Sequence, residues 1–583
     1  MSTLNPELAQ RARAWMSDDP DQSTRADLER RLTAAEAGDE AELTELEGAF
    51  DGTLQFGTAG LRGAMGPGPN RMNVAVVSRA AAGIGAYLRE VVGEARVVIG
   101  YDARYNSRTF AETSAAILTA AGHHVILMPH HCPTPVLAHA VRAKSADCGI
   151  MVTASHNPAR DNGYKVYLGG RAASEDGNGV QIVPPADAQI AAKIAAVGAV
   201  REIPLAESGW EVMPETFVDD YIDAILPIID RASTADQNTV RTARTDLRIV
   251  HTAMHGVGSA TMLAAFERAG FTDIHSVKEQ QEPDPDFPTV PFPNPEEKGA
   301  IDLAAKLAEQ VEADLVIAND PDADRCAAAI YDPRREAWRM LHGDELGLLL
   351  ATYVATHRQV DGTFANSIVS SRSLGALAAA RGYASTQTLT GFKWIARAKN
   401  IAFGYEEAIG YCVLPNVVKD KDGISAALAI AELAALTKAN GSSLVELLDE
   451  LARELGLYLT SQLSIRVSNL DLISQMMHTL RTAPPSTLAG SAVVEVRDLA
   501  EGSLETTGLP PTNGMLLLAE DDSRVIVRPS GTEPKLKAYL EVVSEVEQNA
   551  SFHDLSAARA GAAEKLENMK KELGELLGLS HSH

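Results

Sequence analysis

A repeated pattern of strand, polar loop and alanine-rich helix constrains the fold of this 583-residue chain more than any other sequence feature. The pattern occurs three times, in segments 96–128, 247–277 and 366–389. Its helices end near Gly122, Gly270 and Gly382, which are suitable helix C-cap positions. Because strands that alternate with helices form largely parallel sheets, we expect three similar α/β domains. Each repeat is followed by a strand that ends in a polar loop, where such sheets bind ligands.

The repeat divides the chain into four predicted domains. The fourth has no copy of the repeat, and its short strands and closing helix near 553–578 predict a smaller α+β domain. The first includes a charged helical extension to about residue 48. The predicted domains are 1–210, 211–332, 333–455 and 456–583.

Charge and composition exclude several functional classes. A net charge of −26 disfavours nucleic acid as a partner, but a local positive pocket can still bind a small phosphorylated ligand. The four cysteines are widely spaced, as in proteins of a reducing compartment. The N-terminus shows no secretory signal, and the longest apolar run, which begins at Leu346, is too short to span a bilayer. We therefore expect a cytoplasmic protein without membrane contact.

The segment GIMVTASHNPARDNGYKVY, residues 149–167, follows the first repeat. It places Ser155 and His156 at the predicted end of a strand, with Lys165 ten residues after the serine. A serine next to a basic group is a plausible nucleophile for group transfer. The alternative is a tight turn without chemistry, because Ser, Asn and Pro are ordinary turn residues.

The segment NDPDADR follows the second repeat and contains three alternating acids, Asp320, Asp322 and Asp324. If the loop curls, their carboxylates can converge on one hard cation such as Mg²⁺. An EF-hand is excluded, since Arg325 and Tyr331 stand where that loop needs glycine and glutamate. The alternative is an acidic surface turn, in which the three charges would repel one another.

Three further loops could contact a ligand. A glycine-rich loop surrounds Arg62 and lets backbone amides approach an anion. GYEEAIGY carries Glu406 and Glu407, which could accept hydrogen bonds from sugar hydroxyls, and TGFKWI carries Lys393. Each of these signals also fits a plain surface loop or turn.

The segment RPSGTEPK has the composition of a phosphate clamp, with a bidentate guanidinium, hydroxyl donors and exposed amides. A structural hairpin is the alternative. The candidate phosphate-binding residues are Arg528, Ser530, Gly531, Thr532 and Lys535. A nucleophile, a metal loop, a polyol-binding loop and a phosphate clamp together indicate phosphoryl transfer on a sugar phosphate.

TASHNP, DPDADR, GYEEAIG and RPSGTEP, in this order, resemble the four signature loops of the α-D-phosphohexomutase superfamily, and most of all its phosphoglucomutase-2-like branch. The resemblance covers the chain from FGTAGLRG to the last domain. It implies three similar α/β mixed-sheet domains and a smaller, TATA-box-binding-protein-like fourth domain around a central cleft.

The resemblance also implies roles for individual residues. Ser155 would carry the phosphoryl group and, with Asp320, Asp322 and Asp324, bind Mg²⁺. Glu406 would contact sugar hydroxyls, and Lys393 is a further candidate substrate ligand. Lys165 or His156 would shuttle the proton. The groups around the reacting phosphate would be Arg62, His156, Lys165 and Arg325, and those around the other phosphate Arg528, Ser530, Gly531 and Thr532.

The implied reaction interconverts the 1- and 6-phosphates of a hexose, glucose or mannose, through phosphoserine and a sugar bisphosphate, which is also the expected activator. Many members carry a serine after the paired acids where this chain has Ala408. That difference keeps phosphopentomutase and glucose 1,6-bisphosphate synthase as alternatives. An aspartyl-type sugar phosphatase and a non-catalytic sugar-phosphate sensor are more distant ones. The expected partners are sugar phosphates, and the chain is expected to be a monomer or homodimer.

Overall fold

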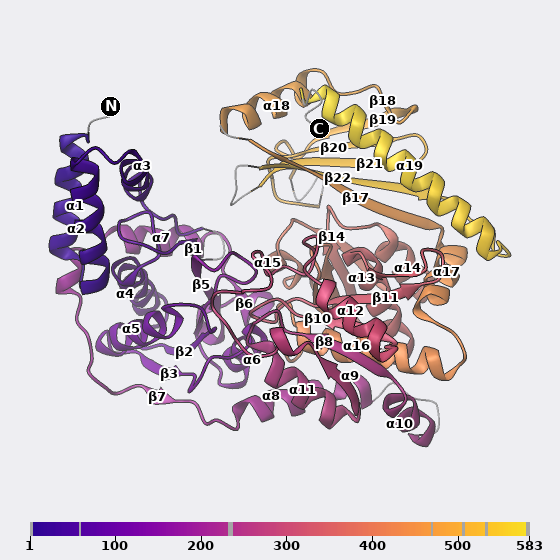
Figure 1. The fold of residues 1–583 in the computed structure, drawn as a ribbon, viewed down its shortest axis with the longest axis horizontal. Helices are drawn as coiled ribbons and strands as arrows, with labels where there is room; N and C mark the ends of the chain where they lie inside the picture. The colour runs from indigo at the N-terminus through magenta and orange to yellow at the C-terminus, as the bar shows by residue number, and fades with distance from the viewer. Residues whose placement is uncertain are drawn as a thin grey trace. The chain divides into compact units, whose positions relative to one another are not determined.

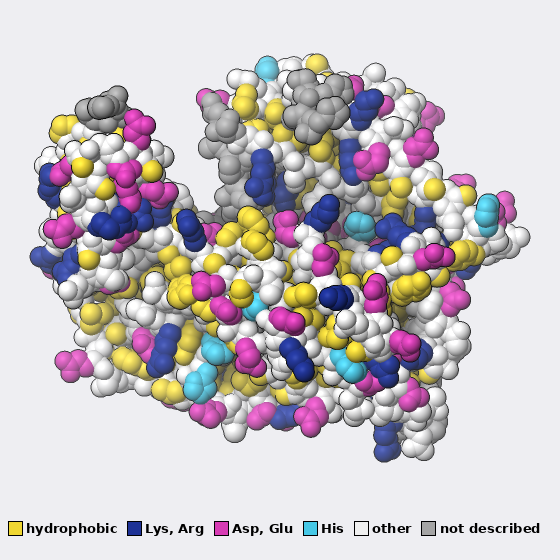
Figure 2. Space-filling model, viewed as in Figure 1, with side chains coloured by type: hydrophobic (Ala, Val, Ile, Leu, Met, Phe, Trp, Pro, Cys, Tyr) yellow, Lys and Arg dark blue, Asp and Glu magenta, His cyan; other side chains and the backbone are white. Residues whose placement is uncertain are grey.

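The chain forms two compact units, composed of residues 1–329 with 410–435 and of residues 330–409 with 436–583 (Figure 1). This computed structural model describes residues 4–57, 60–230, 237–358, 360–467, 470–503, 508–530 and 535–578. Acidic and basic side chains are interspersed over the visible face of each unit (Figure 2).

Three N-terminal helices open the first unit and pack around their own apolar core. They are α1 (Pro6–Asp18), α2 (Gln22–Glu36) and α3 (Glu40–Ala49). Asn5, Asp21 and Asp39 cap their N-termini through side-chain oxygens, as short polar residues do at this position. Leu28 and Leu46 are fully buried between the helices. The predicted helical extension is thus a small bundle.

The first sheet has the order β1-β5-β4-β2-β3-β7, with β6 paired to β5. β4, β2 and β3 are parallel, whereas β5 runs antiparallel to both β4 and β1. Its strands are β1 (Gly60–Ala64), β2 (Arg96–Tyr101), β3 (His124–Leu127), β4 (Cys148–Val152), β5 (Asp161–Leu168), β6 (Val180–Gln181) and β7 (Glu211–Val212). Its helices are α4 (Val74–Val92), α5 (Ser107–Ala120), α6 (Thr134–Ala143) and α7 (Ala186–Ala195).

The second sheet lies mainly in the same unit. β9, β8 and β10 are parallel, β11 runs antiparallel to β10, and β11 continues into the second unit. Its strands are β8 (Arg248–Thr252), β9 (Asp273–Ser276), β10 (Leu315–Ala318) and β11 (Ala327–Asp332). The neighbouring helices are α8 (Phe217–Ile225), α9 (Pro227–Asp230), α10 (Gln237–Thr245), α11 (Gly258–Ala269) and α12 (Asp302–Val311). β16 (Gly410–Cys412) and most of the buried helix α16 (Gly423–Ala439) complete the first unit.

The second unit contains a parallel sheet and an antiparallel sheet. The parallel strands have the order β14-β13-β15, and the antiparallel sheet the order β17-β22-β21-β20-β19-β18. β12 (Ala337–Met340) belongs instead to the sheet of β11. The strands of the other two sheets are β13 (Thr363–Ser367), β14 (Ala384–Thr388), β15 (Ile401–Glu406), β17 (Leu457–Arg466), β18 (Thr487–Leu488), β19 (Ser491–Asp498), β20 (Met515–Ala519), β21 (Arg524–Pro529) and β22 (Lys535–Ser544). The helices are α13 (Gly343–Tyr353), α14 (Ser373–Arg381), α15 (Phe392–Ile395), α17 (Leu444–Leu455), α18 (Leu470–Thr482) and α19 (Phe552–Leu576).

These sheets confirm the predicted fold class of three α/β domains and a smaller α+β domain. The first two α/β sheets mix parallel and antiparallel strands. Gly122, Gly270 and Gly382 follow α5, α11 and α14 with φ of 79°, 88° and 77°, a left-handed conformation that favours glycine at a helix C-terminus. The four cysteines are buried free thiols. Within the described residues, no helix combines the length and apolarity that crossing a membrane requires.

Candidate active site

The predicted nucleophile, Ser155, lies three residues beyond the buried strand β4 on a tight turn. Its backbone N–H donates to Thr153 Oγ1 at 2.9 Å, and its φ of 50° is left-handed, which is uncommon for a residue with a Cβ. The Oγ donates to Asp320 Oδ2 at 2.7 Å and lies 3.2 Å from His156 Nδ1. TASHNP therefore forms a turn, and this turn directs the hydroxyl towards the acidic loop.

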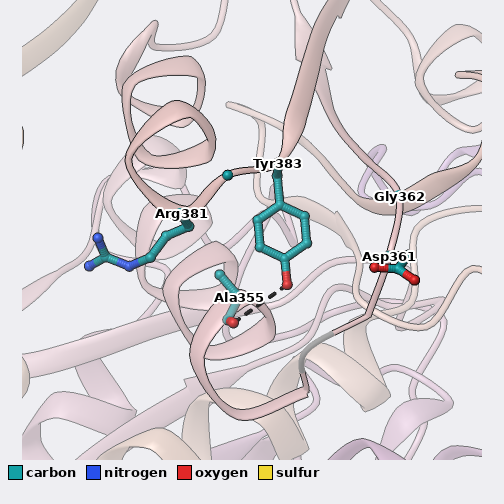
Figure 3. Close-up of a pocket in the computed structure, with 6 residues that line it drawn as sticks. Ala355, Asp361, Gly362, Arg381 and Tyr383 are labelled. Carbon is teal, nitrogen blue, oxygen red and sulfur yellow. Dashed lines mark hydrogen bonds between the residues drawn. The ribbon is translucent and has the colours of Figure 1, made fainter.

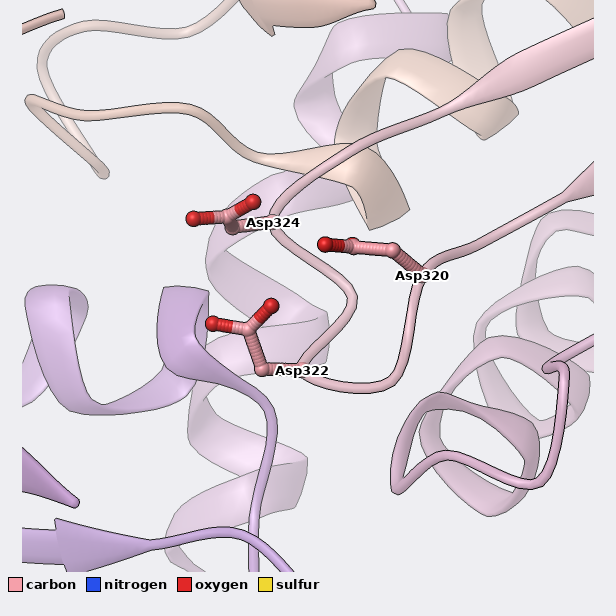
Figure 4. Close-up of side chains that lie close together, drawn as sticks. All are labelled: Asp320, Asp322 and Asp324. Atoms are coloured by element: carbon pink, nitrogen blue, oxygen red, sulfur yellow. The ribbon is translucent and has the colours of Figure 1, made fainter. Parts of the chain in front are cut away.

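The three aspartates of NDPDADR lie at the end of β10 and are fully buried. Ala323 has a φ of 54°, so the loop curls and points the carboxylates of Asp320, Asp322 and Asp324 to one side (Figure 4). One ligand oxygen from each lies within 4.8 Å of the others. The alternative of an acidic surface turn is wrong, because these side chains have no exposed area.

Lys165 compensates part of this buried negative charge. Its Nζ donates to Asp322 Oδ2 at 2.6 Å and to Asp324 Oδ2 at 2.7 Å. Burial alone would raise the pKa of both carboxyls, but the Lys165 ammonium, joined at Asp324 by Lys421 and Arg325, outweighs it and both pKa values are lowered. Asp320 accepts hydrogen bonds from a neutral hydroxyl and a backbone N–H, and burial and the charges of Asp322 and Asp324 raise its pKa to about 8.

The triad fits a divalent cation. Asp322 Oδ1 and Asp324 Oδ1 are buried and accept no hydrogen bond from any described residue. A buried carboxylate oxygen without a donor is costly unless a cation binds it. Three carboxylates supply the hard oxygen ligands that Mg²⁺ prefers. These residues could therefore hold a metal ion.

Arg62 lies on β1, next to the strand of Lys165. β1 pairs with β5 so that Gly60 is opposite Lys165 and Arg62 opposite Gly163. The two strands lie so close together at Gly60, whose φ is 125°, that a Cβ there would lie 1.7 Å from the Tyr164 carbonyl oxygen. The glycine of this loop is thus required by strand pairing. Arg62 Nη1 donates to Asn157 Oδ1 at 3.0 Å, within the serine turn.

His156 and Arg325 also belong to this cluster. Arg325 follows the triad, and its backbone N–H donates to Asp320 Oδ1 at 3.0 Å. Burial, followed by the nearby positive charges of Arg325 and Arg62, holds the pKa of His156 well below its ordinary value. The four residues predicted to surround the reacting phosphate therefore lie in the first unit, as do Ser155 and the three aspartates.

The sequence analysis missed two side chains that contact the triad. Thr134, at the start of α6, donates its hydroxyl to Asp322 Oδ2 at 2.6 Å. Lys421 Nζ lies 3.2 Å from Asp324 Oδ2. Thr134 lies between two prolines without a distinctive signal, but the alternating charges of KDKDG directly before a buried helix could have indicated Lys421.

The two acids that flank Lys421 hold its segment in place. Asp420 accepts hydrogen bonds from the hydroxyl of Tyr167 at 2.8 Å and from Gln181 at 2.9 Å. Asp422 accepts one from the hydroxyl of Tyr221 at 2.8 Å and also caps α16. Residues on β5, β6 and α8 therefore hold the segment of Lys421, which follows the triad by about 100 positions.

In the second unit, the two glutamates of GYEEAIGY differ in their surroundings. Glu407 Oε2 accepts hydrogen bonds from Ser367 Oγ at 3.0 Å and Ser370 Oγ at 2.9 Å. A Cβ on Gly343 would lie 1.8 Å from the Glu407 carbonyl oxygen, so α13 packs directly on this loop. Glu406 ends β15 and is half-buried. Glu407 thus helps to fix the loop, whereas Glu406 remains the candidate sugar ligand.

The phosphate-clamp segment begins at the end of β21 and ends at the start of β22, and these two strands pair antiparallel. Arg528 Nη1 donates to Thr390 Oγ1, which joins this segment to the TGFKWI loop that carries the buried Lys393. The Ser530 N–H donates to the Lys535 carbonyl at 2.8 Å. This strand pairing fits the hairpin interpretation, and the phosphate clamp stays a prediction. Gly531 and Thr532 lie outside the described residues.

A further basic residue, Lys537, lies directly opposite Arg528 in the β21–β22 register. Two like charges opposite each other on antiparallel strands destabilise a sheet unless an anion neutralises them. No described carboxylate forms an ion pair with either residue. The alternation of KLK after the clamp could have revealed Lys537, because residues 535 and 537 of a strand share a face.

A surface cavity of about 360 Å³ lies elsewhere in the second unit (Figure 3). Its walls include Asp361, Arg381 and Tyr383, whose hydroxyl donates to the Ala355 carbonyl at 3.5 Å. None of the predicted ligand residues lines it. The cavity therefore has no part in the candidate site.

Comparison with known proteins finds four domain models that match successive parts of the chain. Models of phosphoglucomutase/phosphomannomutase α/β/α domains I, II and III match residues 53–200, 219–332 and 342–455, and the C-terminal domain model matches residues 492–558. A Haemophilus influenzae protein named "Probable phosphomannomutase" is 43% identical over 81% of this chain and 93% of its own length. A Pongo abelii phosphopentomutase is 33% identical over 99% of this chain and 95% of its own length.

Comparison with solved structures also finds a protein named as a phosphoglucomutase. The structure of parafusin, a phosphoglucomutase from Paramecium, superimposes with a TM-score of 0.67 and 19% identity, over 90% of this chain and 96% of that one. That likeness supports the fold alone. The family is established by the 43% identity over nearly the whole length of a relative, together with the four domain matches. The chain belongs to the phosphoglucomutase/phosphomannomutase family.

Proposed function

We propose that this protein is a phosphosugar mutase that interconverts the 1-phosphate and 6-phosphate of glucose, mannose or both. The observation that carries the proposal is the buried hydrogen bond of 2.7 Å from Ser155 Oγ to Asp320, the member of the carboxylate triad that Lys165 does not bind. A serine hydroxyl beside a candidate cation site provides a phosphoryl carrier and the charge needed to stabilise transfer.

In the first half-reaction, a sugar hydroxyl oxygen attacks the phosphorus of phosphoserine. The P–O bond to Ser155 Oγ breaks as the new bond forms, and the bisphosphate results. In the second, Ser155 Oγ takes the other phosphoryl group from this bisphosphate. Bound Mg²⁺, held by Asp320, Asp322, Asp324 and a phosphoserine oxygen, would neutralise charge on the transferring group.

The proton of the attacking hydroxyl also needs an acceptor. His156 Nδ1 lies 3.2 Å from Ser155 Oγ, whereas Lys165 Nζ already donates to two carboxylates. We therefore assign the proton transfer to His156 and electrostatic stabilisation to Lys165. Arg62 and Arg325 would orient the reacting phosphate, as planar guanidinium groups do.

The second unit supplies the proposed ligands for the rest of the substrate. Glu406 would accept hydrogen bonds from sugar hydroxyls, and Lys393 would add a positive charge. Arg528, Ser530, Gly531, Thr532 and Lys535 would hold the phosphate that does not react. Because either phosphate must occupy this clamp in turn, its donors recognise charge rather than one sugar position.

Two experiments test the proposal. Mass spectrometry of the enzyme treated with glucose 1,6-bisphosphate should locate an acid-stable phosphoserine at Ser155, and Ser155→Ala should abolish turnover. An acid-labile acyl phosphate on an aspartate would instead indicate the phosphatase alternative. A Ser155→Ala variant with wild-type mutase activity would refute the mechanism. Substrate binding without turnover in the wild type would indicate a non-catalytic sensor.

Phosphopentomutase is the second candidate, and two observations favour it. Ala408 lacks the hydroxyl that many sugar loops of the superfamily carry, and a relative named phosphopentomutase aligns over 99% of this chain. Comparison of kcat/KM for glucose 1-phosphate, mannose 1-phosphate and ribose 1-phosphate decides between them. A large preference for the pentose would overturn the hexose assignment. The domain limits at 210, 332 and 455, the cytoplasmic location, the bisphosphate activator and a monomeric or dimeric state stay predictions.

A further inference from the structure

Arg104 binds the turn that carries Ser155 through four main-chain carbonyls. Its Nη2 donates to the carbonyl oxygens of Ser155 and Asn157, both at 2.6 Å. Its Nη1 donates to those of Pro158 at 2.8 Å and Asp161 at 3.1 Å. Only 1% of the side chain is exposed, so water does not compete for these bonds. The guanidinium thus holds the turn through four hydrogen bonds to its main chain.

These bonds stabilise a backbone that is unfavourable by itself. Ser155 has a φ of 50°, and a left-handed residue with a Cβ persists only when its surroundings determine the conformation. Arg104 binds the carbonyl oxygen of this residue, and the conformation directs Oγ to within 2.7 Å of Asp320. A lysine could not replace it, because an ammonium is a point donor whereas a guanidinium offers a planar fork.

The surroundings of Arg104 hold it in one orientation. Asp102 lies 3.4 Å from Arg104 Nε and is itself fixed by the Ser107 hydroxyl at 2.6 Å. The guanidinium carbon lies 4.9 Å from the ring centre of Phe287, which is also buried. Next to it, the Tyr105 hydroxyl donates to Asp286 Oδ2 at 3.0 Å. The segment of Asp286 and Phe287, about 180 residues away in the sequence, therefore covers the arginine.

We propose that Arg104 is a positioning residue for phosphoryl transfer, which fixes Ser155 in its left-handed conformation so that Oγ faces Asp320, and that Phe287 keeps Arg104 in place. The inference rests on the proposed function of Ser155 as phosphoryl carrier. Arg104 contacts no reacting atom and acts only through the turn. Misplacement of a reacting atom by about 1 Å can lower a rate by about 100-fold.

The test compares Arg104→Lys and Phe287→Leu with the wild type. The phosphoenzyme is prepared with ³²P-labelled glucose 1,6-bisphosphate, and its transfer to glucose 1-phosphate and mannose 1-phosphate is followed in a single turnover. Arg108→Lys is the matched control, because Arg108 lies on the exposed face of α5 and pairs with Glu112 at 2.8 Å. Phe287→Tyr keeps an aromatic ring beneath the guanidinium and serves as the conservative variant.

Arg104→Lys should slow transfer by about 100-fold, while KM and the Mg²⁺ dependence stay within about threefold of wild type. Phe287→Leu should slow it by about three- to tenfold, and Phe287→Tyr and Arg108→Lys should match the wild type. A purely structural role would lower the melting temperature but leave the rate of the folded fraction unchanged, which overturns the proposal. If Arg104→Lys does not fold, a wild-type transfer rate in Phe287→Leu overturns it instead.

Failure of the underlying function gives a different result. In that case, the wild-type enzyme forms no phosphoserine at Ser155, and both proposals fall together. If the wild type forms and transfers phosphoserine but folded Arg104→Lys does so equally fast, only the role of Arg104 is wrong.

Discussion

Replacement of Lys165 by methionine should weaken folding and catalysis but strengthen metal binding. Methionine has a similar length and leaves Asp322 Oδ2 and Asp324 Oδ2 without their ammonium donor, at 2.6 and 2.7 Å in the wild type. Loss of one partner of a buried ion pair costs about 3–5 kcal/mol, because the remaining charge stays buried. For a unit of this size, that corresponds to roughly 4–7 °C in melting temperature in the absence of metal.

The effect on metal affinity has the opposite sign. A divalent cation on the same carboxylates would lie on the order of 5 Å from the ammonium, where repulsion amounts to about 7 kcal/mol at an effective dielectric constant near 20. Reorganisation reduces this figure, so we expect the variant to bind Mg²⁺ at least about tenfold more tightly. Activity should nevertheless fall by about 1,000-fold or more, because the transferring phosphoryl group loses a fixed positive charge.

Calorimetric melting with EDTA or Mg²⁺, Mg²⁺ titration calorimetry and single-turnover transfer measure the three effects. Lys193→Met is the control, because Lys193 pairs with Glu90 on the surface, where an ion pair contributes about 0–1 kcal/mol. Weaker Mg²⁺ binding by Lys165→Met, or an unchanged melting temperature in EDTA, would refute the view that Lys165 and the metal share the triad.

Three further predictions concern other parts of the chain. Tyr221→Phe removes the 2.8 Å hydrogen bond to buried Asp422, and urea unfolding should show a loss of about 1–3 kcal/mol; no change would mean that Asp422 finds another donor. Lys537→Ala should raise KM for sugar phosphates about three- to tenfold with kcat retained, whereas Arg497→Ala, which removes an exposed pair with Glu495, should leave KM unchanged; equal KM values would exclude Lys537 from the clamp. Burial would raise the pKa of Glu345, but Arg339 outweighs it and lowers that pKa to about 2. The stability that Glu345 contributes is therefore present above its unfolded pKa of 4.5 and is lost as pH falls towards 2. The difference in urea midpoint between wild type and Glu345→Gln should therefore shrink between pH 5 and pH 2, and a constant difference would contradict this assignment.

Local patterns in the sequence determined the elements and the chemistry of each loop. Strand-helix alternation and the glycines after α5, α11 and α14 predict the α/β domains, because C-capping and strand formation depend on neighbouring residues. Likewise, three alternating acids after an apolar strand predict a cation site, because a curled loop of five residues is sufficient to bring them together.

Only the tertiary structure decided which distant residues complete these loops. Thr134 and Lys421 contact the triad from about 190 positions before it and about 100 after it, and Arg104 holds the serine turn from about 50 positions away. The tertiary structure also distinguished the two glutamates, because two serines donate hydrogen bonds to Glu407. Glu406 is therefore the candidate sugar ligand. A sequence pattern records local spacing, whereas hydrogen bonds and charge neutralisation depend on distances that chain folding sets.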